Sequence, residues 1–197
     1  MKFVKLIAIA VVAGLVSGCA TVTPPLEGVQ DVSATRAEQA NATSGQNWRV
    51  ADVRVHVPST LKVSEANLYM PDADIVWRED HFGDRRQQVS EIIDMAVSQA
   101  VLPLQGQREV FLDVELHRFH ALTQKARATV GGVHNIAFSV SIRDAETEAV
   151  LVDAFPVEIK LKAYGGSKAI KSEMQGQTQK SRITNEIAKV MRKYLRS

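Results

Sequence analysis

The chain has 197 residues, of which 24 are Lys or Arg and 22 are Asp or Glu. The positive excess comes from Lys2 and Lys5, so the chain beyond residue 18 is neutral, with 22 basic and 22 acidic residues. A neutral balance argues against nucleic-acid binding and against electrostatic membrane docking as the main activity. With Cys19 as the single cysteine, the chain has no pair for an internal disulfide.

The first 18 residues are typical of a secretory signal peptide. Lys2 and Lys5 form a short basic region, and residues 6–16 form an almost unbroken apolar run. A run of this length that ends in small residues is the hydrophobic region of a signal sequence. A membrane-spanning helix needs about 20 apolar residues, so the run is too short to be one.

The end of this segment resembles the lipobox of bacterial lipoproteins. Residues 15–19 read LVSGC, with Leu first and Gly-Cys last. The resemblance implies cleavage before Cys19, transfer of diacylglycerol to its thiol, and acylation of the new amine with a fatty acid such as palmitate. Two or three acyl chains on one residue make release from a membrane very slow. Ala20 replaces the Asp that marks retention in the inner membrane, which implies an outer-membrane anchor and a domain that faces the periplasm.

Residues 19–47 are expected to form the acylated cysteine and a flexible tether. Pro24-Pro25 opposes regular structure because proline lacks a backbone donor and restricts its predecessor. Residues 41–47 are polar and turn-forming, a composition that favours a flexible spacer. About 150 residues remain at 48–197, enough for one domain with its own hydrophobic core.

Alternating apolar residues predict four strands in this domain. They lie at about 50–57, 110–117, 136–142 and 150–161, and Pro58 ends the first of them. One apolar and one polar face per strand is typical of an antiparallel sheet that is covered on one side.

Two helices are clear from apolar residues that recur every three or four positions. The first runs to Val101 and begins after Asp84, which is a suitable N-terminal cap. The second covers about 183–195, and a weaker helical pattern around Ile170 is interrupted by Gly176. We therefore expect an α+β fold, a two-layer sandwich in which two helices pack on one face of an antiparallel sheet of about four strands.

Residues 64–83 show no clear periodicity. A connection of this length in a compact domain is either functional or contains a further element, for which Ile75–Trp77 is a candidate short strand. Tyr69, Trp77 and Phe82 lie among acidic residues here and form a candidate interaction surface. Carboxylates beside aromatic rings can bind sugar, whereas a solvated acidic loop is the simpler interpretation.

No residues in the sequence have the spacing of a catalytic or metal site. His117 and His120 differ by three positions and therefore face opposite sides of a strand, and no cysteine or carboxylate pair completes a zinc site. Gly131-Gly132 lacks the spacing of a phosphate loop and is interpreted as a turn or bulge. We interpret all five histidines as surface residues: His56, His81, His117, His120 and His134. We expect no cofactor, no metal and no enzymatic activity.

Two segments resemble an uncharacterised family of alphaproteobacterial lipoproteins. They are residues 63–78, which begin VSEAN and end DIVWR, and residues 118–134, which begin RFHALT and end VGGVH. The likeness covers most of residues 48–197, but a family without an assigned activity supplies no site residues. More loosely, the order of elements is similar to that of small α+β lipoproteins that assist lipopolysaccharide export or peptidoglycan synthesis.

These observations predict an outer-membrane-anchored periplasmic lipoprotein. We expect it to act as a non-enzymatic adaptor or accessory subunit in envelope assembly or transport. Its partners would be the membrane, through lipid on Cys19, and an envelope protein. The alternative is a ligand-binding module for lipid, glycan or peptidoglycan, which requires an apolar or aromatic cleft of about 300–1,000 Å³.

Overall fold

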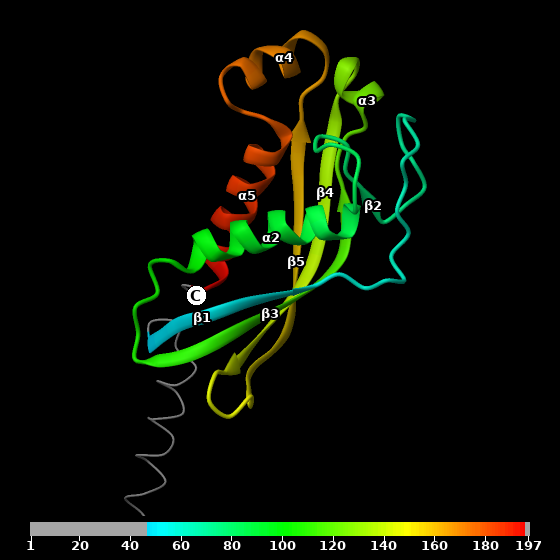
Figure 1. Ribbon diagram of the computed structural model, residues 1–197. Helices are drawn as coiled ribbons and strands as arrows, with labels where there is room; N and C mark the ends of the chain where they lie inside the picture. The colour runs from blue at the N-terminus through cyan, green and yellow to red at the C-terminus, as the bar shows by residue number, and fades with distance from the viewer. Residues whose placement is uncertain (1–46, 196–197) are drawn as a thin grey trace, which may run out of the picture.

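The computed structural model describes residues 47–195 (Figure 1). The predicted signal peptide, Cys19 and the tether up to Gln46 lie outside the described residues. The strands are β1 (Trp48–His56), β2 (Ile75–Val76), β3 (Arg108–His120), β4 (Gly132–Asp144) and β5 (Val150–Ala163). The helices are α2 (Arg85–Val101), α3 (Gln124–Ala128), α4 (Gly166–Met174) and α5 (Gln179–Tyr194). In this part of the chain, no helix is long and apolar enough to cross a membrane.

The five strands form one mixed sheet in the order β1-β3-β4-β5, and β2 pairs with β3 beyond the end of β1. β3, β4 and β5 are antiparallel, whereas β1 and β2 run parallel to β3. The α+β class is confirmed, and the four predicted strands are present, but the sheet has a fifth strand and is only partly antiparallel. The reason is α2, which lies between β1 and β3 in sequence: a strand that follows a helical crossover runs parallel to the strand before it.

The hydrophobic core lies between the sheet and two helices, α2 and α5, which cover one face (Figure 1). The inward positions of β3 and β4 alternate as predicted, and Val110, Leu112, Ile136 and Val140 are fully buried. α2 begins where predicted, because the Asp84 carboxylate accepts hydrogen bonds from the backbone N–H groups of Arg86 and Gln87. Among residues 47–195, the members of this core extend from Trp48 to Leu195.

α3 and α4 lie at one end of the sheet, opposite the start of β1 and the end of α5 (Figure 1). Two glycine-containing turns meet at this end. Gly131 has a φ of 73°, and a side chain on Gly165 would lie 2.0 Å from the backbone nitrogen of Gly131. The predicted turn at Gly131-Gly132 is therefore confirmed, and glycine is required here because the two backbones touch.

His134 lies inside the domain and not on its surface. Its side chain is fully buried at the start of β4, and neither ring nitrogen has a hydrogen-bond partner among the described residues. Burial, with the nearby charge of Arg182, lowers the pKa of His134 from 6.5 to about 4. His120 is also buried, and its Nε2 lies 3.1 Å from the carbonyl oxygen of Pro71. The interpretation of all five histidines as surface residues is therefore wrong for these two.

Protonation of His134 makes the stability of the domain depend on pH. The unfolded chain takes up this proton near pH 6.5 and the folded chain only near pH 4, so the free energy of unfolding falls as pH decreases through that window. The slope reaches up to about 1.4 kcal/mol per pH unit. Urea denaturation at several pH values should show this slope in the wild type and a flatter one in His134→Leu. His56→Gln, a change at an exposed histidine, is the control; an equal flattening in that variant would contradict the assignment.

Candidate functional site

The candidate site is the connecting segment, defined here as residues 57–84 between β1 and α2. It leaves the sheet at the end of β1 and returns at β2, where Ile75 and Val76 pair with Phe119 and His120 of β3. The backbone N–H of Ser64 donates to the carbonyl of Ile75 over 3.0 Å, which closes the base of the segment. The short strand expected at Ile75–Trp77 is present but covers only Ile75 and Val76, and residues 64–74 form a loop outside the sheet.

Trp77 does not belong to an interaction surface, because it is fully buried in the core. Its ring packs edge-to-face on Phe119 with 5.7 Å between the ring centroids. Its indole N–H donates to Oδ2 of Asp80 over 2.8 Å, which satisfies the one polar group of a buried tryptophan. The prediction of Tyr69, Trp77 and Phe82 as one surface is therefore wrong for Trp77: β2, which immediately precedes Trp77, pairs with β3, and the Trp77 ring packs on Phe119 of β3.

Tyr69 and Phe82 are exposed, with 52% and 86% of their surface accessible to solvent. Tyr69 lies between Leu68 and Met70, which are also largely exposed, and we call these three residues the apolar ridge. The Lys125 ammonium lies 4.6 Å from the centroid of the Tyr69 ring, and the Arg85 guanidinium lies 5.9 Å from that of Phe82. Exposed apolar side chains that are adjacent in this way are typical of contact surfaces.

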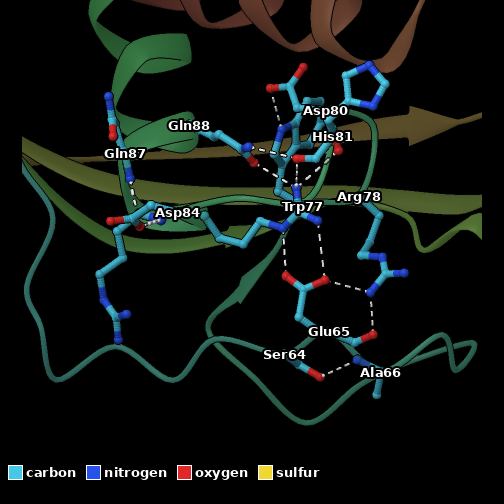
Figure 2. A network of polar contacts seen from close by, with 12 residues as sticks. Ser64, Glu65, Ala66, Trp77, Arg78, Asp80, His81, Asp84, Gln87 and Gln88 are labelled. Carbon is cyan, nitrogen blue, oxygen red and sulfur yellow. Dashed lines mark hydrogen bonds and ion pairs between the residues drawn. The ribbon is translucent and has the colours of Figure 1, made fainter.

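An ion pair between the buried Arg85 and the exposed Glu65 holds the connecting segment against the start of α2 (Figure 2). Arg85 is 5% exposed, and its Nε and Nη2 donate to the two carboxylate oxygens of Glu65 over 2.6 and 3.2 Å. Arg78 Nη1 donates to the same carboxylate over 2.7 Å. The hydrogen bond from Arg85 is the main reason that the pKa of Glu65 lies below its usual value.

The remaining donors of Arg85 are also satisfied. Nη1 lies 3.1 Å from the carbonyl oxygens of Asp80 and His81 and 2.7 Å from Oε1 of Gln88 (Figure 2). A buried guanidinium whose partners all come from one loop and one helix turn fixes the loop conformation, since each lost partner leaves a buried charged donor unpaired. The network is therefore structural, and its side chains are engaged with one another.

The acidic residues around Trp77 serve the same purpose. The Asp80 carboxylate accepts hydrogen bonds from the Trp77 indole N–H and from the Lys180 ammonium, which lies 3.0 Å from Oδ2. Glu79 accepts from the backbone N–H of Lys180 over 2.7 Å. These contacts attach the segment to the first turn of α5. In the part of the chain that the structure describes, no three His, Cys, Asp or Glu side chains are arranged to hold a metal ion.

The outer part of the segment rests on the junction between β3 and α3. Thr123 Oγ1 donates to the carbonyl oxygen of Leu68 over 2.6 Å, and the backbone N–H of Lys125 donates to Oδ1 of Asn67 over 2.8 Å. The start of the apolar ridge is thus held by two hydrogen bonds, while the ridge side chains are exposed to solvent. Such preorganisation lowers the entropy that an exposed loop loses on binding.

The depression on the uncovered face of the sheet is shallow, with a volume of about 360 Å³. Its volume suits a small ligand, but one of its two carboxylates is already paired: Asp113 accepts from Arg54 over 2.5 Å and from Arg143 over 2.8 Å. Tyr69, Trp77 and Phe82 do not line it, nor do they line the two other depressions described, one near Arg49 and one near Gln179.

Loss of the Glu65 charge should destabilise the domain. In Glu65→Gln the buried Arg85 loses its counter-charge, and we expect the free energy of unfolding to fall by about 1–3 kcal/mol, as measured by urea denaturation. Limited proteolysis should cut the variant within residues 57–84 first, because the segment loses its attachment. Asp72→Asn is the matched control, since Asp72 pairs with Lys62 in full solvent and such pairs contribute little. Equal stabilities of the two variants would show that Glu65 does not hold the segment.

Solved structures resemble this chain only distantly. The PelC dodecamer from Paraburkholderia phytofirmans shares 12% identity, with 76% of this chain and 88% of that chain covered and a TM-score of 0.34. A candidate lipoprotein from Caulobacter crescentus shares 16% identity, with 54% and 80% covered and a TM-score of 0.33. A DUF330 protein from Xanthomonas campestris shares 6% identity, with 77% and 80% covered and a TM-score of 0.36. TM-scores this low support no inference about function.

The chain matches none of the curated proteins with which it was compared. The model of DUF6778, a family of unknown function, matches residues 48–197. The expected membership of an uncharacterised family is therefore confirmed, while the lipobox lies outside the matched residues. This chain belongs to the DUF6778 family of unknown function.

Proposed function

We propose that this chain is an outer-membrane lipoprotein that acts as a non-enzymatic adaptor, docking on an envelope protein through the apolar ridge Leu68–Met70. The observation that carries the proposal is the ridge itself: three exposed apolar residues, held in place by hydrogen bonds from Thr123 and Lys125. Adjacent exposed apolar side chains are typical of contact surfaces, and Met70 is the most exposed of the three, at 83%.

The polar groups near the ridge support a binding role rather than a catalytic one. Glu65, Asp80 and Arg85 are each committed to partners within the protein. A catalytic acid or base needs a free lone pair or proton that faces a substrate. The alternative of a module for lipid, glycan or peptidoglycan has less support, since it relied on Trp77 as part of an exposed aromatic site.

The membrane anchor is tested by Cys19→Ser. Acyl transfer requires the sulfur nucleophile, so we expect the variant to lose labelled palmitate and to leave the membrane fraction. The domain should keep its fold, because the core described here, from Trp48 to Leu195, does not include Cys19. Ala20→Asp is the matched variant: it should keep the label but move to the inner membrane. If Cys19→Ser is processed normally and still sediments with outer membranes in high salt, the lipoprotein assignment is wrong.

The docking surface is tested by site-specific photo-crosslinking in intact cells. A photoreactive residue at position 69 should give one discrete protein adduct, because Tyr69 lies at the centre of the ridge. The same residue at position 189, where Lys189 is exposed on α5, should give none. Met70→Ser should reduce the adduct at least several-fold without a change in melting temperature, since apolar anchors carry most of an interface's binding energy. Equal adducts at both positions, or none with several crosslinkers, would refute the ridge as the docking surface.

A further inference from the structure

The basic residues of the domain are concentrated at one end, beside the acidic connecting segment, whose Glu79 and Asp80 contact Lys180. Residues 123–134 and 160–182, which we call the basic tip, contain eight of the 22 basic residues that follow residue 18 but only one of the 22 acidic ones, Glu173. These two ranges include α3, the start of β4, the end of β5, α4 and the start of α5. They gather at the end of the domain that lies opposite the start of β1 (Figure 1).

Most of this positive charge is not neutralised inside the protein. Arg127 pairs with Glu173, and Lys180 pairs with Asp80. Among the described residues, the other six cations of the tip form no ion pair: Lys125, Lys160, Lys162, Lys168, Lys171 and Arg182. Five of these six are lysines, whose flexible stems and compact charges suit a fluid anionic surface better than a site of fixed geometry.

Apolar side chains are interspersed with these lysines. Ile170 and Met174 of α4 are 59% and 85% exposed, and they lie four positions apart on the same helix face. Lys171 is exposed beside them, while Ala169 and Ser172 face the protein. On β4, the exposed Val133 is in register with Lys162 of β5. A helix that presents lysines together with protruding apolar side chains is typical of binding at a membrane interface.

We infer that the basic tip binds the anionic surface of a phospholipid membrane, with α4 lying in the headgroup region. The lysines attract acidic headgroups, and Ile170 and Met174 enter the boundary with the acyl chains. The sum of charges argues against such docking only when the charges are evenly distributed, and here they are sorted to one end. The inference goes beyond the adaptor role and holds whether or not Cys19 carries lipid.

The test uses the chain from Ala20 to Ser197, which contains every core residue found in the described part of the chain. We expect it to co-sediment with vesicles of phosphatidylcholine and phosphatidylglycerol but not with phosphatidylcholine alone, and to be released by salt. Lys168→Glu/Lys171→Glu should weaken binding at least about tenfold. Ile170→Ser/Met174→Ser should weaken it several-fold while the salt dependence remains.

Lys189→Glu/Lys193→Glu is the matched control, because it makes the same charge change on two exposed lysines near the other end of α5. It should leave the affinity within about twofold, since electrostatic attraction falls off within a Debye length. Circular dichroism checks that each variant is folded. Absence of binding to the anionic vesicles at low salt, or equal losses in the α4 and α5 variants, would overturn the inference. If charge reversal on α4 spares vesicle binding but abolishes a crosslinked protein adduct, the tip contacts an acidic protein and the lipid inference is wrong.

Discussion

The shared edge of β3 is the constraint on which the candidate site depends. β3 has 13 residues, and β1 pairs with its first part, from Arg108 to Glu115. The rest of that edge is left to β2, which pairs with Phe119 and His120. Because unpaired strand edges leave backbone groups without partners, the chain must leave the sheet after β1 and return as β2. The projecting loop, and with it the apolar ridge, follows from the length of β3.

A projecting loop is costly in conformational entropy unless something orders it. Here a buried charge supplies the order: Arg85 sits at the start of α2 with little access to water, and Glu65 is the carboxylate that neutralises it. Leaving the buried Arg85 charge without a partner would cost more free energy than the loop would gain in conformational entropy by becoming disordered. The side chains of the ridge are therefore exposed while the backbone of its loop is ordered, and a docking surface needs both properties.

Local pattern predicted the regular elements but not the contacts between distant residues. The apolar periods of α2, β3 and β4 follow from burial of one face, so they are visible in the sequence. The burial of Trp77 cannot be predicted from the sequence pattern, because it depends on Asp80 accepting the indole N–H and on β2 pairing with β3. The Glu65–Arg85 pair spans 20 residues without a periodic signal. The burial of His134 could have been predicted, since it lies in phase with the inward-facing Ile136 and Phe138.

The concentration of basic residues at one end of the domain could not be predicted from the sequence either, for a topological reason. Antiparallel pairing brings the end of β3, the start of β4 and the end of β5 to the same end of the sheet, so lysines from two distant stretches of sequence meet there. The ridge is attached to this end, since Leu68 and Asn67 are hydrogen-bonded to Thr123 and Lys125 next to α3. A tip that lies on a membrane therefore holds the ridge close to the lipid surface. The protein that meets the ridge is then expected to be one that is itself at the membrane.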